Sequence, residues 1–249
     1  MRMTPAQRHF ARKSGMAAAI AIGAAALGGA ATDDDNRPSP YRLQLAELGE
    51  CLRELKQIQA REGKIARKRE LIARFDAWVA GVLDAHRAGG PAVQDDVVLT
   101  MMVWALDIED HERALDLIAY VVGNDLVMPE RYTRTAPTIV AEIAADNALA
   151  ALGRGEQPDL TFLQLVEEAT REKDMIDQVR AKLHKAIGLT MIFEPSDDAE
   201  PERERAGGWR AALAAAIPQL KRALQLHDKV GVKKDIEKAE RELAKLKET

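Results

Sequence analysis

The sequence contains little of several residue types on which common folds and sites depend. Among its 249 residues there is one cysteine, Cys51, so neither an intramolecular disulfide nor a zinc site built from several thiolates can form. This cysteine usage favours the reducing interior of a cell. Aromatic residues make up only 4%, which argues against a β-sandwich or barrel, whose strands favour aromatic and β-branched residues.

Catalytic motifs are also missing. The only serines are Ser14, Ser39 and Ser196, all in polar or loop-like contexts, which makes a serine hydrolase a poor interpretation. There is no G-x-x-x-x-G-K-[ST] motif for an ATPase P-loop and no H-E-x-x-H motif for a zinc protease. We therefore expect no catalytic residue, no metal site and no cofactor.

The residues that are abundant favour helices. Hydrophobic residues make up 47% and charged residues 31%, and Ala and Leu supply most of the apolar mass, a mixture typical of long helices with charged surfaces. No segment shows a convincing alternation of apolar and polar residues. We predict an all-α fold, in which a long N-terminal helical hairpin or coiled-coil segment precedes a tetratricopeptide-like array of shorter helices.

The first 39 residues allow two interpretations. One is a basic N-terminal arm, partly helical, joined to the rest of the chain by a flexible linker. The other is a secretory signal, since arginines precede an Ala/Gly-rich stretch at 16–31. Ala and Gly contribute little membrane-transfer energy, and the stretch is weak for a membrane span.

A long helical segment is expected over residues 40–90. Ser39 and Pro40 form a helix start, with the serine as N-cap and the proline at the first position. The leucines that follow have the 3-4-3 spacing of a coiled coil or helical hairpin, and we predict that they mediate oligomerisation: Leu45, Leu48, Leu52 and Leu55.

The remaining chain divides at loop signals. We expect a central helical domain at 91–193, with amphipathic runs at about 137–152, 160–171 and 175–192. A charged segment with two prolines at 194–207 is expected to be an exposed loop, and 208–249 a C-terminal helical hairpin. The helix pairs resemble tetratricopeptide hairpins, although no strict 34-residue repeat is visible.

Charge is distributed unevenly. Residues 1–90 contain 15 Lys/Arg and 10 Asp/Glu, whereas residues 91–249 contain 21 and 30. Clustered cations at helical spacing can contact successive phosphates, and a solvated helix face is the other interpretation. The candidate DNA-binding residues are Arg8, Arg12, Lys13, Lys64, Arg67, Lys68, Arg69 and Arg74.

Carboxylates suggest a second possibility. A cluster with the residue types of a magnesium site for phosphodiester hydrolysis is present in Asp107, Glu109, Asp110 and His111, with Asp95 and Asp96 as further candidates one helix earlier. The favoured interpretation is structural: acidic residues in first turns and caps stabilise helices. A third possibility is a tetratricopeptide-like scaffold that binds proteins only.

Particular motifs resemble the small terminase subunit of peduovirus-type phages. They occur in collinear order over nearly the whole chain, and the main departures are residues 16–31 and the loop near 194–207. The matching segments are Thr4–His9, Lys68–Ile72, Trp78–Leu83, Gln94–Val97, Trp104–Asp107, Ala114–Tyr120, Leu126–Pro129, Arg134–Thr135, Pro137, Val179–Lys185, Ala223–Leu226 and Gly231–Lys234.

The resemblance implies a role in phage genome packaging. Such subunits bind viral double-stranded DNA near its packaging site, assemble into homo-oligomeric rings and deliver the DNA to a large terminase subunit with the ATPase motor. The resemblance also implies the cytoplasm of the bacterial host and no membrane partner, and it disfavours the signal peptide, because Thr4–His9 belongs to the match. The family is often labelled an endonuclease subunit; in terminases generally, cutting resides in the large subunit, and we expect the same here.

Overall fold

The structure is a computed structural model that describes residues 39–193 and 202–246. The described residues form helices and no strands, which confirms the predicted all-α class. The chain divides into two compact units, residues 1–131 and 132–249. No helix in the described ranges is long and apolar enough to cross a membrane.

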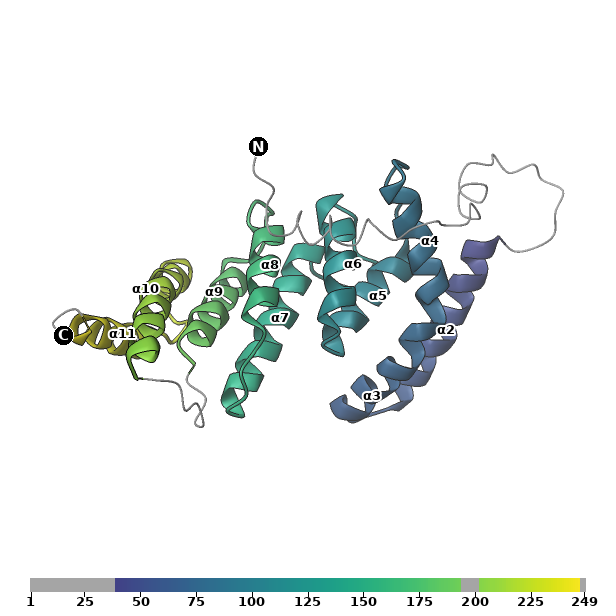
Figure 1. Ribbon diagram of the computed structural model, residues 1–249. Coiled ribbons are helices and arrows are strands. Elements are labelled where there is room, and N and C mark those ends of the chain that lie inside the picture. Colours follow the sequence, from purple (N-terminus) through teal and green to yellow (C-terminus); the bar gives the residue numbers. More distant parts are fainter. Residues whose placement is uncertain (1–38, 194–201, 247–249) are drawn as a thin grey trace. The chain divides into compact units, whose positions relative to one another are not determined.

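The first unit contains five α-helices in its described part, residues 39–131. They are α2 (Pro40–Gln57), α3 (Arg61–Leu71), α4 (Asp76–Arg87), α5 (Asp96–Asp107) and α6 (His111–Gly123), and a short 3₁₀ helix, η1 (Ile72–Phe75), joins α3 to α4 (Figure 1). The predicted helix start is confirmed: Ser39 accepts a hydrogen bond from the Arg42 amide at 3.3 Å, and Pro40 is the first helical residue.

Helix α5 is the core of this unit. Its residues 97–106 are all buried, as expected for a helix that is apolar on every side. Trp104 of α5 packs edge-to-face on Phe75 of η1, with ring centroids 6.2 Å apart. Because α5 also packs against α2 and α6, it joins residues 40–87 in one unit, which ends at Arg131. The domain boundaries expected from the sequence stay predictions.

Segment 40–90, expected as a long hairpin or coiled coil, is divided into shorter helices. Ile58 has extended backbone torsions (φ −83°, ψ 124°), which end α2. The 3₁₀ turn η1 then buries both Ile72 and Phe75. The two interruptions turn the chain back onto α5 and so give the segment a core to pack on.

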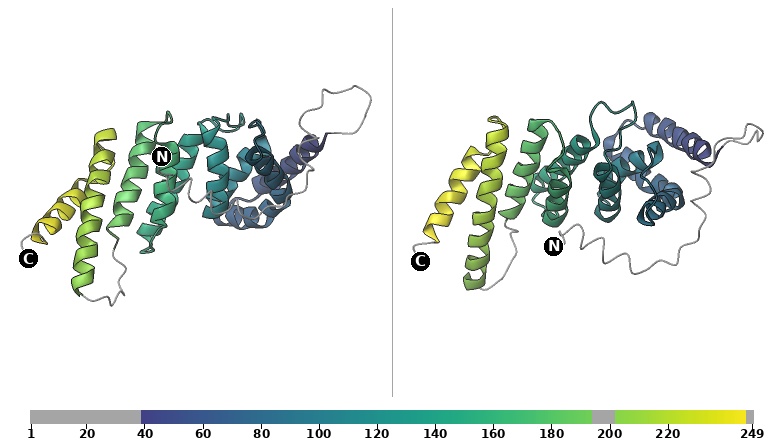
Figure 2. Two further views of the ribbon diagram at one scale, coloured as in Figure 1. Left: turned by 45° about the horizontal axis from the view of Figure 1, so that its top comes forward. Right: turned by 90° about the horizontal axis from the view of Figure 1, so that it is seen from above.

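The second unit contains α7 (Ala136–Gly153), α8 (Leu160–Thr170), α9 (Asp177–Met191), α10 (Glu202–Leu226) and α11 (Lys233–Lys245) in its described part. Helix α9 packs against α7, α8 and α10, and α11 lies beside α10 (Figures 1 and 2). The first three helices confirm the runs expected at 137–152, 160–171 and 175–192. Helix α10 begins inside the segment expected as a loop at 194–207, whose residues 194–201 lie outside the described part. The tetratricopeptide-like pairing stays a prediction.

Helices α9 and α10 approach closely at one glycine. A Cβ atom at Gly188 would lie 2.7 Å from both Cγ and Cδ2 of Leu220. Leu220 is fully buried and forms a small core with Val232 and Ile236, which ties α11 to the same contact. The absence of a side chain at Gly188 therefore sets how closely α9 and α10 pack.

Candidate nucleic-acid interface

The basic cluster of the first unit lies on α3 and η1, and most of its cations have partners within the unit. Arg67 donates from Nε to Oε1 of Glu54 on α2 at 2.5 Å, and its Nη1 pairs with Glu70 one turn along α3. The hydrogen bond from Arg67 lowers the pKa of Glu54. Arg67 thus fastens α3 to α2.

Two further cations fasten α3 to the end of α5. Lys68 forms an ion pair with Asp107, the last residue of α5, and both side chains are less than one quarter exposed. Arg69 donates from Nη2 to the carbonyl oxygen of Ile108 at 3.4 Å. Cations stabilise a helix C-terminus because its unpaired carbonyl groups carry partial negative charge, so both residues act as a cap for α5.

The last cation of the cluster, Arg74, lies beside the single cysteine. Its Nη1 is 4.0 Å from Sγ of Cys51. Burial raises the pKa of Cys51, and the charge of Arg74 opposes this increase. The thiol is therefore held in its neutral form at neutral pH, as a core group of α2.

Two cations of α3 remain available to a ligand. Arg61 is exposed and Lys64 is half-buried, and neither makes an ion pair within the part of the chain that the structure describes. Arg61 was not singled out by sequence reasoning, although it lies three residues before Lys64, on the same helical face. The predicted residues Arg8, Arg12 and Lys13 lie outside the described residues.

The predicted leucine seam is divided between the core and the surface. Leu48 and Leu55 are 2% and 6% exposed, so they are buried within the unit. Leu45 and Leu52 are half-buried, and the nearby Leu43 is 54% exposed. Helix α2 therefore uses two of the four leucines internally and keeps two near its surface.

The carboxylates considered as magnesium ligands have structural roles. Asp95 is 3% exposed; its Oδ1 accepts from the amides of Val97 and Val98 at 2.8 and 3.0 Å, and its Oδ2 accepts from Nε1 of Trp78 at 2.8 Å. Burial raises the pKa of Asp95, and these hydrogen bonds oppose the increase. Asp95 is the N-cap of α5 and joins it to α4.

Asp110 is the N-cap of α6, and its Oδ1 accepts a hydrogen bond from the Arg113 amide at 3.2 Å. Its Oδ2 also accepts from Nε of the Arg113 side chain at 3.0 Å. Glu109 has a positive φ of 59° in the turn between α5 and α6. Within residues 39–193 and 202–246, no group of three or more His, Cys, Asp or Glu residues is arranged to hold a metal ion. The hydrogen bonds of Asp95 and Asp110 to helix amides are those of N-caps, which fits the structural interpretation of these two residues.

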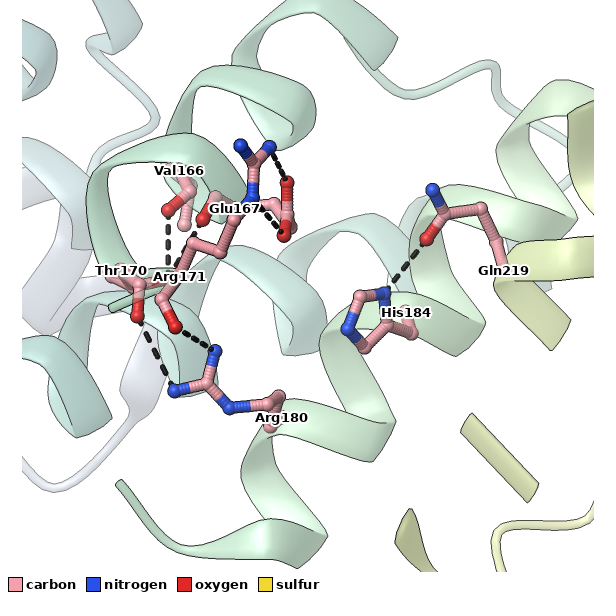
Figure 3. A network of polar contacts seen from close by, with 7 residues as sticks. All are labelled: Val166, Glu167, Thr170, Arg171, Arg180, His184 and Gln219. Carbon is pink, nitrogen blue, oxygen red and sulfur yellow. Dashed lines mark hydrogen bonds and ion pairs between the residues drawn. The ribbon is translucent and has the colours of Figure 1, made fainter. Parts of the chain in front are cut away.

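The second unit contains a polar network that sequence reasoning missed (Figure 3). Arg180 of α9 donates to three carbonyl oxygens at the end of α8: Thr170 at 3.3 Å, Arg171 at 3.1 Å and Lys173 at 2.6 Å. Nearby, Nδ1 of His184 lies 2.7 Å from Oε1 of Gln219 on α10. Burial lowers the pKa of His184, so a neutral imidazole links α9 to α10.

Comparisons with known proteins place this chain in a family. The family described as phage small terminase subunit matches residues 45–178. The chain is 39% identical over 240 residues to "Terminase, endonuclease subunit" of Escherichia phage P2, covering 96% of this chain and 85% of that protein. The chain belongs to the phage small terminase subunit family.

A second relative of this small terminase subunit is more distant. It is "Probable terminase, endonuclease subunit" of Haemophilus phage HP1, 27% identical over 157 residues, covering 60% of this chain and 52% of that protein. No solved structure matches the chain. The family match contains the whole α3 cluster but ends at residue 178, so α10 and α11 lie beyond it.

Proposed function

We propose that the protein is the DNA-recognition subunit of a phage packaging terminase. It binds viral double-stranded DNA near its packaging site and delivers the DNA to a large subunit that holds the ATPase motor. Membership of the small terminase family supports the packaging role. The observation that supports DNA binding is that the cations of α3 fall into two groups. Some hold the helix in place through contacts within the unit, and others, Arg61 and Lys64, make no ion pair within the described residues.

The open cations lie at the first turns of α3. Positive side chains beside the positive end of a helix are favourable only when an anion is close, and Glu62 is the one acidic residue in that turn. The N-cap, Ala60, provides no side-chain hydrogen bond. Arg61 and Lys64 are therefore suited to bind a phosphate group. Arg67 and Lys68 fix the position of the helix that carries them.

The predicted contacts of Arg8, Arg12 and Lys13 extend this proposal. In a basic arm before α2, they add phosphate contacts that determine affinity and salt dependence rather than sequence readout. The assembly is a homo-oligomeric ring, and the half-buried Leu45 and Leu52 provide an apolar strip on α2 through which copies associate.

A fluorescence anisotropy titration with phage end DNA at several salt concentrations tests the proposal. Replacing Arg61 and Lys64 by Gln is expected to reduce the salt slope of binding by about two. The matched control replaces Arg53 and Lys56, exposed cations of α2, by Gln. Binding that is equally affected by both pairs, or by neither, removes α3 from the interface.

A second candidate function is endonuclease activity, which the names of the two relatives suggest. Incubating the protein with magnesium and phage end DNA tests this alternative, and we expect no cleavage. Cleavage that is lost when Asp107 and Asp110 are replaced by Asn, in variants that retain their thermal stability, supports a nuclease instead.

A further inference from the structure

The connection between α10 and α11 is held rigidly. Lys185 of α9 donates from Nζ to the carbonyl oxygen of Val230 at 2.9 Å. Gly231 has a φ of 80°, a conformation that favours glycine. The next residue, Val232, is fully buried against Leu220 and Ile236. The turn therefore has a fixed path, with one cation used to hold it.

This turn carries a concentration of positive charge. Residues 221–234 contain five Lys/Arg and one acidic residue, Asp228. Lys221 pairs with Glu240. The other four cations are exposed and form no ion pair within the described residues; we call them the turn cations: Arg222, Lys229, Lys233 and Lys234.

The turn cations lie at one end of the α10–α11 hairpin. Arg222 is four residues, about 6 Å of helix, before the end of α10, and Lys233 and Lys234 are the first two residues of α11. The N-cap of α11, Val232, provides no side-chain hydrogen bond, so the partial positive charge of the helix end adds to that of the lysines.

The surroundings of the turn favour phosphate over a protein partner. The centre of a protein interface is more apolar than its rim, yet none of the exposed large hydrophobic residues of the described chain, Leu43, Val127 and Ile176, belongs to residues 221–234. Lysines act as flexible point charges that accept any local arrangement of phosphates. A surface of unpaired lysines with no apolar centre suits a nucleic-acid backbone, which it binds by releasing counterions.

We propose that the turn cations form a second DNA-binding surface, which holds the phosphate backbone of duplex DNA without reading its sequence. This inference rests on the proposed function, because it assumes that duplex DNA is the ligand. It adds a contact that lies beyond the family match, within residues 91–249, whose total charge is negative. The protein thus contacts DNA through both units.

The test measures anisotropy of the full chain with a labelled 30-base-pair duplex of arbitrary sequence, across a salt series. The variant replaces Lys229, Lys233 and Lys234 by Gln, and a matched control replaces Arg154, Arg171 and Arg210, exposed cations elsewhere in the second unit, by Gln. The lysine variant is expected to reduce the salt slope by about two to three relative to wild type, whereas the control leaves it unchanged.

Each other result has a distinct meaning. If the wild type binds DNA and the lysine variant matches it, the turn surface is overturned and the proposed function stands. If the wild type binds no duplex at low salt, both proposals fail. If the lysine variant keeps its DNA affinity but loses binding to the large terminase subunit, the turn is a protein-docking surface, and the inference is wrong.

Discussion

Arg67 of α3 and Glu54 of α2 are joined by a hydrogen-bonded ion pair of 2.5 Å between residues 13 positions apart in sequence. The pair shows that a cluster of basic residues in a phage DNA-packaging family includes members that organise the fold. The side chain of Arg67 is 29% exposed, so water reaches it only in part, and Glu70 occupies a further face of the guanidinium group. Two carboxylates therefore already compensate the charge of Arg67 and use two of its five N–H donors, which makes it a poor phosphate contact.

Replacing Arg67 by Gln therefore affects stability before it affects DNA binding. The variant is expected to lower the thermal midpoint, because α3 loses its link to α2, and to leave the salt slope of DNA binding within error of wild type. Thermal unfolding and anisotropy on the same preparation check the two effects. A reduced salt slope with an unchanged midpoint contradicts this assignment and makes Arg67 a phosphate contact.

The same pair predicts a dependence on pH. Since Arg67 lowers the pKa of Glu54 in the folded protein, this carboxylate contributes stability above its unfolded pKa, and the contribution is lost as pH falls through the lower folded value. Wild type and Glu54→Gln are expected to differ at pH 7 and to converge in acid. If the stability difference between wild type and Glu54→Gln instead grows as pH falls, the dependence has the opposite sign, and the ion pair does not stabilise the protein.

Sequence patterns predicted the helices well but not the partners of the charged residues. The helix starts at Ser39 and Asp95 follow from local capping chemistry, which the sequence contains in full. The basic cluster depends on contacts over long separations: Lys68 meets Asp107 39 residues away. Periodicity shows that cations share a helix face, but it cannot show that the end of another helix lies against that face.

The turn cations were overlooked for a different reason. They lie within residues 91–249, whose total charge is negative, and a count over that whole range hides the local surplus of positive charge at 221–234. In the leucine seam, Leu48 and Leu55 share one heptad position and are buried, whereas Leu45 and Leu52 share the other and are half-buried. The spacing defines these two positions, but only the place of α5 decides which of them meets the core.

Gly188 provides a prediction about packing. Gly188→Ala adds a methyl group 2.7 Å from Leu220, and overpacking of this kind destabilises a protein by about 1–3 kcal/mol. The control is Gly208→Ala on α10, where a Cβ meets nothing within 4 Å and the higher helix propensity of alanine is expected to be neutral or stabilising. Denaturant unfolding measures both variants. Equal stability of the two contradicts the close approach of α9 and α10.

His184 predicts an acid sensitivity of the second unit. Burial lowers its pKa in the folded protein, while Gln219 and Glu167 favour the charged form and Arg222 and Arg180 oppose it. A histidine with a lowered folded pKa contributes stability above its unfolded pKa, near 6.5, and this stability is lost as pH falls toward the folded value.

The thermal midpoint of wild type is therefore expected to fall between pH 7 and pH 5 more steeply than that of His184→Gln. Replacing His227, a half-buried histidine at the end of α10, by Gln controls for the loss of a titratable group. Parallel pH profiles for wild type and His184→Gln would show that the imidazole titrates in the same range whether the protein is folded or unfolded, contrary to the burial argument.

Substitutions of different leucines on α2 are expected to affect the proposed assembly and the folding of each copy separately. Leu45 and Leu52 are half-buried and one heptad apart, so glutamate at both positions is expected to disrupt association between copies while each copy stays folded. Leu55 is buried within the unit, and Leu55→Ala is expected to cost about 2–5 kcal/mol of stability by leaving a cavity. Mass photometry reports the assembly state and circular dichroism the folding. A Leu45→Glu, Leu52→Glu variant that remains fully assembled excludes this strip, because two charges per copy cannot be buried in an apolar contact without a large desolvation cost.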